Sequence, residues 1–388
     1  MPFRKLNAIQ EAIRGENLGG WLFWNFRHRD RLSDDILELS PGLTNSRHWF
    51  YAVPAEGSPV KIVHAIEETH LDTLPGEKIS YYSREELNSA LKTLGGKSWG
   101  AHVSETISIL SYLDAGTAAI LESAGLQLCS AAPLVQRFKG LLDETGIESH
   151  EKAARHLYDI VDECWAMVRE AYAAGTVLYE GDIRDAMLRK MDERNIATDH
   201  PPVVGTGINS SDSHYDFSGR GAPFKEGDVV QFDLWAKEKT EKAIYADISW
   251  VGVFAKNAPA QIEEAFANLV SSREGAYTFI EEELSAGRRP TGAMVDAKTR
   301  EILIGHGYGS AIKHRTGHGI DTECHGSGVN IDSVEFTDQR LLLDGACFSL
   351  EPGIYFSDFG MRTEIDVYIK KGKPIVSGRD RQFRLLTC

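Results

Sequence analysis

The chain has 388 residues, 42% of them hydrophobic and 26% charged, which excludes collagen-like, disulfide-scaffold and bulk-disordered proteins. A formal charge of −15 argues against nucleic acid or anionic lipid as a partner, because both are themselves negatively charged. The five cysteines show no CxxC spacing and are interpreted as reduced thiols. Since we find no membrane-length apolar run and no signal-like N-terminus, we expect a cytoplasmic globular protein.

The first third of the chain alternates helical and strand-like patterns. Elements are predicted at 6–13, 21–26, 49–53, 60–63, 84–94 and 126–129. This alternation predicts an α/β domain over residues 1–133, in which we find no chemical motif.

From residue 134 onward, long helical patterns and separate strands predict an α+β domain over 134–388. Helices are predicted at 153–171, 183–191 and 262–284, and strands at 228–235, 243–251, 348–355 and 361–369.

Two of the predicted strands each carry a carboxylate among apolar neighbours, Asp233 in the first and Asp247 in the second. A carboxylate buried in such a strand is costly unless it is protonated, hydrogen-bonded or bound to a cation. The two strands are expected to form a hairpin that brings these carboxylates close together. The alternative is that both point into solvent from a half-exposed sheet.

Three histidines follow within twelve positions, His314, His318 and His325, and Gly317 and Gly319 flank the middle one. Glycine lets the backbone approach a ligand closely. Such a group favours a metal or proton-transfer site, and a hydrogen-bonded loop cluster is the alternative. Cys324 adjoins the last histidine, but we find no second cysteine nearby that would favour it as a ligand.

Glu351 and Glu364 lie in the last two predicted strands, and Pro352-Gly353 places the first of them at a strand end. With Asp233 and Asp247 they make a charge of −4, which two divalent ions would neutralise. Oxygen ligands with a single imidazole, that of His318, suit manganese, iron, cobalt or zinc.

This order of motifs resembles the creatinase/aminopeptidase P/prolidase group of metallopeptidases, family M24. The motifs are an Asp…Asp strand pair, Thr-Gly-His-Gly, Glu-Pro-Gly and Arg-x-Glu. The resemblance implies a pita-bread catalytic domain preceded by an α/β creatinase-type N-terminal domain, and a homodimer. It also implies two divalent ions, manganese above all with cobalt, zinc or iron as alternatives. Their implied ligands are Asp233, Asp247, His318, Glu351 and Glu364.

The resemblance further implies catalytic roles for Glu351, His325 and His314. For contact with the substrate, His214 and Arg362 match positions that border the pocket in the proline-specific members.

Three departures bear on the substrate. Trp235 stands where the group usually has glycine, and for that reason we also place it among the substrate-binding residues. Ser249-Trp250 replaces the usual Thr-Arg, and Gly326-Ser327-Gly328 follows His325 in place of Glu-x-Pro.

The sequence therefore predicts a dinuclear metal-dependent exopeptidase, an Xaa-Pro aminopeptidase or dipeptidase, that hydrolyses a peptide bond with a hydroxide bridging the ions. The first alternative is a non-peptidase enzyme of the same fold, a creatinase-like amidinohydrolase or a metal-dependent lyase acting on a small organic acid. The second is a non-catalytic peptide-binding module, although such modules tend to lose the charged ligands.

Overall fold

The computed structural model describes residues 5–40, 42–379 and 381–388, and the chain divides into two compact units, residues 1–139 and 140–388. This boundary lies a few residues after the expected one, which was between residues 133 and 134. Helix α5 (Ala132–Phe138) accounts for this difference, because its Leu134 and Val135 belong to the core of the first unit.

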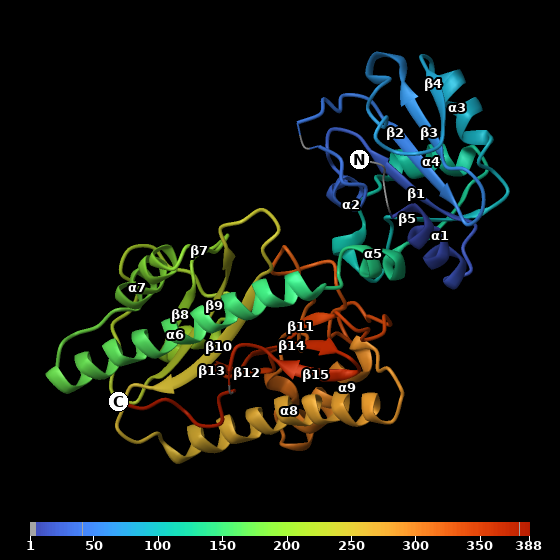
Figure 1. The fold of residues 1–388 in the computed structure, drawn as a ribbon. Helices are drawn as coiled ribbons and strands as arrows, with labels where there is room; N and C mark the ends of the chain where they lie inside the picture. The colour runs from blue at the N-terminus through green and yellow to red at the C-terminus, as the bar shows by residue number, and fades with distance from the viewer. Residues whose placement is uncertain (1–4, 41, 380) are drawn as a thin grey trace. The chain divides into compact units, whose positions relative to one another are not determined.

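The first unit is built on a sheet of six strands in the order β4-β3-β2-β1-β5-β6 (Figure 1). The strands are β1 (Gly20–Asn25), β2 (Trp49–Pro54), β3 (Val60–His64), β4 (Glu77–Tyr81), β5 (Ser98–Ala101) and β6 (Gln127–Ser130). The helices are α1 (Leu6–Gly15), α2 (Arg31–Ile36), α3 (Arg84–Lys92) and α4 (Ala115–Ser123), with α5 and the short 3-10 turns Ala65–Glu67 and Ser108–Leu110.

Alternation along β1 gives this sheet two buried faces. Trp21 and Phe23 pack into a core with residues of α1, α2 and α5, whereas Leu22 and Trp24 pack on the other side with residues of α3 and α4. Successive side chains of a strand point to opposite faces, so a strand that is apolar throughout can be covered by helices on both sides.

In its described residues, the second unit holds two long helices and three small sheets. Its helices are α6 (Glu144–Ala174), α7 (Glu180–Glu193), α8 (Ala260–Ser285) and α9 (Gly292–Gly305), with the 3-10 turns Gly207–Ser211 and Gly309–Ala311. One sheet has the order β10-β9-β7, with β8 also paired to β9; the others are β11-β14-β15 and β12-β13. The strands are β7 (Ile196–Ala197), β8 (Val203–Thr206), β9 (Val229–Glu238), β10 (Ala246–Val253), β11 (Cys347–Leu350), β12 (Gly353–Tyr355), β13 (Gly360–Arg362), β14 (Ile365–Lys370) and β15 (Lys373–Val376).

Helix α6 covers one face of the β9–β10 hairpin (Figure 1). It begins at Asp143, whose side chain accepts a hydrogen bond from the Gly146 N–H, and it ends at Gly175, whose φ of 63° suits glycine. Helix and strand meet closely at Gly252, where an added Cβ would lie 2.1 Å from the Trp165 ring. Only glycine allows this approach.

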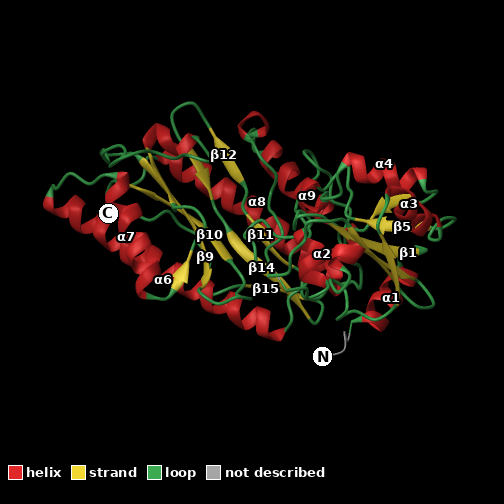
Figure 2. Ribbon diagram, turned by 90° about the horizontal axis from the view of Figure 1, so that it is seen from above, coloured by secondary structure: helices red, strands yellow, loops and turns green. Residues whose placement is uncertain are grey.

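Helix α8 packs on β11 and β15 and shares an apolar core with β9, β10, β12 and β13, so that α6 and α8 flank the sheets of this unit (Figures 1 and 2). Helix α9 packs against α8. None of the helices within the described ranges combines the length and apolarity needed to cross a bilayer.

The two predicted C-terminal strands are each broken in two. Glu351 and Pro352 separate β11 from β12, and Thr363 and Glu364 separate β13 from β14. Both glutamates therefore lie at strand ends, where neighbouring backbone does not fix them in a regular ladder.

Candidate metal centre

The β9–β10 hairpin brings the two strand aspartates together. Its antiparallel register pairs Asp233 with Ser249 and Asp247 with Trp235. Phe232 and Leu234 point into the core beneath α6, so Asp233 lies on the opposite face. Asp233 is 7% exposed and Asp247 is 5% exposed, and the alternative in which both face solvent is wrong.

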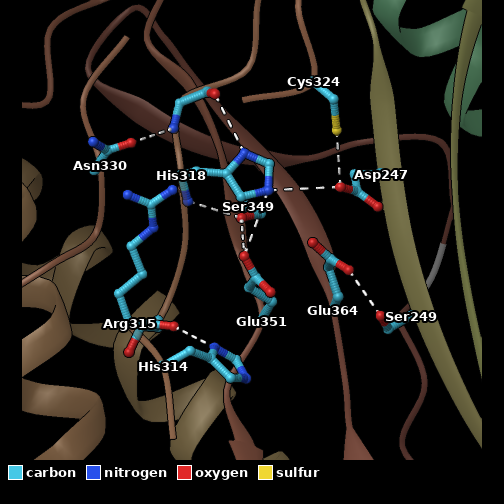
Figure 3. A network of polar contacts seen from close by, with 12 residues as sticks. Asp247, Ser249, His314, Arg315, His318, Cys324, Asn330, Ser349, Glu351 and Glu364 are labelled. Atoms are coloured by element: carbon cyan, nitrogen blue, oxygen red, sulfur yellow. Dashed lines mark hydrogen bonds and ion pairs between the residues drawn. The ribbon is translucent and has the colours of Figure 1, made fainter. Parts of the chain in front are cut away.

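Five side chains meet on this face: two come from the strands β9 and β10, one from the loop that carries His318, and two from the strand breaks at Glu351 and Glu364. His318 Nε2 lies 3.6 Å from Asp247 Oδ2 and 3.5 Å from Glu351 Oε1. Ligand atoms of Asp233, Asp247 and Glu364 lie within 4.8 Å of one another, as do those of His318, Glu351 and Glu364. The side chains of Asp247, His318, Glu351 and Glu364 converge in Figure 3.

These carboxylates are short of counter-charge and hydrogen bonds. Asp247 Oδ1 and Glu364 Oε1 are buried and have no hydrogen-bond partner among the described residues. Burial raises the pKa of Asp247 and of Glu351 to about 8, and it raises the pKa of Glu364 well above its usual range. Buried oxygens of this kind require protons or a cation. Oxygen ligands with one imidazole fit divalent metal ions.

Ser249 and Arg362 hold the carboxylates in place. Ser249 Oγ lies 2.7 Å from Asp233 Oδ1 and 2.9 Å from Glu364 Oε2, and it accepts a hydrogen bond from Arg362 Nε at 3.0 Å. Arg362 also forms an ion pair with Asp233. The positive charge of the Arg362 guanidinium therefore neutralises part of the −4 charge of the four carboxylates.

The imidazole of His318 is aimed by its loop. The His318 backbone N–H donates to Ser349 Oγ at 3.0 Å, and Nδ1 lies 3.3 Å from the Gly319 carbonyl oxygen. Because a carbonyl oxygen only accepts, a hydrogen bond to it requires the proton on Nδ1. The lone pair of Nε2 is then free to bind a cation among the carboxylates. An added Cβ at Gly317 would lie 2.0 Å from Ser349 O, which is why this backbone approach requires glycine.

Of the other two histidines, His325 lies at the cavity and His314 does not. His325 lines the cavity, and its ring centroid lies 4.2 Å from that of His318. The neighbouring His318 and burial lower the pKa of His325. His314 is not among the cavity-lining residues; its Nδ1 lies 2.7 Å from Arg315 O and its Nε2 lies 2.8 Å from Tyr355 Oη.

A cavity of about 520 Å³ opens above the cluster. Its walls include the expected substrate residues His214, Trp235 and Arg362. The indole N–H of Trp235 donates to Asp199 Oδ1 at 2.6 Å. This hydrogen bond fixes the ring beside Asp199 in the cavity wall.

Sequence reasoning missed the roles of Ser249 and Asp366, and it considered Cys324 as a ligand but did not favour it. Asp366 accepts a hydrogen bond from the Asp247 backbone N–H at 2.7 Å, and Cys324 Sγ lies 3.1 Å from Asp247 Oδ2. The adjacency of Cys324 to His325 was a usable signal. The contacts of Ser249 and Asp366 depend on strand register, which the sequence does not display.

Comparison with known proteins places this geometry in a family. Residues 147–371 match metallopeptidase family M24. A probable dipeptidase PepE of Mycobacterium tuberculosis is 26% identical over 278 residues, covering 70% of this chain and 66% of that protein. The chain thus spans just under two thirds of the length of that relative.

Solved structures of other proteins share the fold. Dipeptidase PepE from Mycobacterium ulcerans superposes with a TM-score of 0.72 at 19% identity, covering 99% of this chain and 97% of that one. A prolidase from Thermococcus sibiricus superposes with a TM-score of 0.64 at 22% identity, covering 100% of both chains. The expected α+β pita-bread fold with its α/β N-terminal domain is confirmed, and so is the resemblance drawn from the motifs. The chain belongs to metallopeptidase family M24.

Proposed function

We propose that the protein is a metal-dependent exopeptidase that hydrolyses dipeptides or removes an N-terminal residue, with proline favoured after the scissile bond. The observation that carries this proposal is the convergence of four carboxylates and one imidazole at the floor of a cavity. Two of the carboxylate oxygens are buried and find no hydrogen-bond partner in the described part of the chain.

Two divalent ions, manganese or a related metal, would be held by Asp233, Asp247, His318, Glu351 and Glu364. When bound, such ions supply a nucleophile from water near neutral pH and polarise the scissile carbonyl.

The protein's own side chains then handle the protons. Glu351 lies at the cavity floor between His318 and Arg362, where it accepts the proton of the attacking water and passes it to the leaving amine. His325 faces the same space and donates a hydrogen bond to the oxygen that becomes negative. These are the two groups we assign to catalysis at the reacting atoms.

His314 acts through other residues. A hydrogen-bond chain runs from His314 to Tyr355 Oη and from there to Arg362 Nη1, at 2.8 Å and 3.2 Å. The chain fixes the guanidinium that pairs with Asp233. We therefore propose that His314 positions Arg362 and does not itself touch the reacting atoms.

The size and charge of the cavity favour a short substrate with a free amino group. A volume of about 520 Å³ lies within the range for small-molecule sites. Asp199 on its wall offers a carboxylate to an ammonium group. The preference for dipeptides and for proline draws on the names of the related dipeptidases and prolidase.

A substrate panel tests the proposal. Metal-loaded protein is incubated with Xaa-Pro and Xaa-Ala dipeptides, Xaa-Pro-Yaa tripeptides and N-acetylated copies of each, and products are followed by mass spectrometry. We expect cleavage of the unblocked peptides, none of the acetylated ones, and loss of activity with a chelator. Cleavage of acetylated peptides, or of none at all by metal-loaded protein, would overturn the proposal.

One observation favours a second candidate, a small-molecule enzyme of the same fold. Trp235 lines the cavity at a position where the family usually has glycine. Creatine and small organic acids therefore belong in the same panel. If metal-loaded protein cleaves no peptide but converts creatine or one of the organic acids, the small-molecule enzyme is favoured.

The homodimer and the cytoplasmic location implied by the resemblance also remain proposals. Light scattering of the purified protein measures the first, and a mass near twice 43 kDa is expected.

A further inference from the structure

Cys324 is directed into the metal centre. It is 4% exposed, and its Sγ lies 3.1 Å from Asp247 Oδ2. In Figure 3 the sulfur points towards Asp247 from the side opposite Glu364. The same Asp247 oxygen lies 3.6 Å from His318 Nε2. One carboxylate oxygen is therefore shared between a sulfur and an imidazole nitrogen.

We propose that Cys324 is a further metal ligand, so that the ion next to His318 is bound by sulfur as well as by oxygen and nitrogen. This inference rests on the proposed metal-dependent function and concerns which ion that position prefers.

The spacing suits ligation of one ion. Ligand atoms of Asp247, His318 and Cys324 all lie within 4.8 Å of one another. Metal–sulfur bonds of about 2.3 Å and metal–oxygen or metal–nitrogen bonds of about 2.1 Å place two ligand atoms of one ion roughly 3 to 3.7 Å apart. The distances around Asp247 Oδ2 fall in this range.

Buried oxygens beside the sulfur point independently to a bound cation. Asp247 Oδ1 and Glu364 Oε1 have no hydrogen-bond partner among the described residues. A second group, Asp233, Asp247 and Glu364, contains oxygen ligands alone. Asp247 therefore belongs to two groups of different chemistry, one with sulfur and nitrogen and one with oxygen only.

This difference predicts unequal metal preferences at the two positions. Thiolate ligands favour zinc and cobalt over manganese, whereas carboxylates accept manganese. On binding, the Cys324 thiol releases its proton to solvent and its sulfur binds the ion as thiolate. We therefore expect zinc or cobalt beside His318, even where manganese fills the all-oxygen position.

Cobalt substitution tests the assignment without an activity measurement. Full-length protein is stripped with a chelator, loaded with Co²⁺ alone, and compared with Cys324→Ser and with Cys164→Ser, a control at a buried cysteine in the core beneath α6. We expect thiolate-to-cobalt charge-transfer absorption in the near ultraviolet for wild type and Cys164→Ser. Cys324→Ser should lose this absorption and keep the visible cobalt bands.

Zinc affinity gives a second readout. Cys324→Ser should weaken Zn²⁺ binding by at least about tenfold and change Mn²⁺ binding less, as measured by competition with a chromophoric chelator. If Cys324→Ser does not fold, X-ray absorption of the zinc-loaded wild type decides, because a sulfur neighbour at about 2.3 Å is distinguishable from oxygen or nitrogen at about 2.1 Å.

The outcomes separate this inference from the proposed function. Visible cobalt bands without charge transfer in wild type, together with peptide cleavage, would show that Cys324 only donates a hydrogen bond to Asp247, and the peptidase proposal would stand. Failure of the wild type to bind Co²⁺, Zn²⁺ or Mn²⁺ at all would overturn both.

Discussion

Each candidate metal ligand is held by a neighbour that is not itself among the five. Ser249 contacts the carboxylates of Asp233 and Glu364, and Ser349 Oγ lies 3.2 Å from Glu351 Oε1. Such outer contacts orient the ligands of a metal and tune its affinity. The chemistry of the site therefore depends on small hydroxyl side chains as well as on the charged ones.

Substitution of the histidines separates binding from catalysis. His318→Ala should abolish metal binding near the imidazole and with it activity. His325→Ala should keep the metal and lower kcat by roughly 10² to 10⁴, the range for lost acid–base or oxyanion assistance. Metal content by plasma mass spectrometry and kcat for one dipeptide are measured on each. His306→Ala, at the end of α9, is the control and should keep both metal and activity. Full activity in His318→Ala would refute the assignment of His318 as a metal ligand.

Ser249 gives a test of the outer contacts. Ser249→Ala removes the acceptor of the Arg362 Nε hydrogen bond and the group between two carboxylates, so metal affinity should fall about 10- to 100-fold. Ser249→Thr keeps the hydroxyl and should stay near wild type. Calorimetric titration with Mn²⁺ measures both variants, and equal affinities for Ala and Thr would show that the hydroxyl does not matter.

The candidate ligands could be read from the sequence because charged residues stand out in apolar strands and because their order is specific. The contacts around them could not. Ser249 faces Asp233 only in the observed register, and the ion pair of Arg362 with Asp233 joins segments 129 positions apart. Such pairings follow from tertiary packing, which local patterns do not encode.

At the scale of the elements, helices with an apolar stripe were predictable, and those with a polar buried face were not. Helix α6 buries Ala153, Leu157 and Val161 on one side, which gives a clear period. Helix α9 was missed, because its buried residues include Asp296 and Thr299. The break after β11 was foreseen at Pro352-Gly353, whereas the break at Glu364 carries no glycine or proline.

The contact between α6 and β10 depends on one glycine. Gly252→Ala would place a Cβ against the Trp165 ring, so the free energy of unfolding should fall by about 1–3 kcal/mol, as in other overpacked cores. Urea denaturation of the metal-loaded protein measures this. Gly305→Ala, where nothing lies within 4 Å of an added Cβ, serves as the matched control. A Gly252→Ala variant as stable as this control would contradict the packing described.

The buried carboxyl groups of the candidate metal centre make the stability of the folded protein depend on pH. Burial raises the pKa of Asp247 and Glu351 to about 8, above the value of roughly 4 in an unfolded chain. Between these values the metal-free folded protein holds protons that the unfolded chain has lost, so these groups lower its stability as pH rises towards 8.

Metal binding should reverse this trend, because the cation displaces those protons. The increase in Tm on adding Mn²⁺ is therefore expected to be larger at pH 8 than at pH 6, by calorimetry with chelator-treated protein as the reference. An equal or larger increase at pH 6 would mean that these carboxylates do not bind the ion.

We propose that Asp233, Asp247, His318, Glu351 and Glu364 would together hold two ions, because Asp247 belongs to both a sulfur- and nitrogen-containing group and an all-oxygen group. Calorimetric titration of chelator-stripped protein with Mn²⁺ measures the number of ions bound per chain. We predict two for the wild type and at most one for Asp247→Asn, since that residue belongs to both ligand groups. A wild type that binds fewer than two ions, or an Asp247→Asn variant that binds two as tightly as wild type, would show that these five residues do not hold a pair of ions.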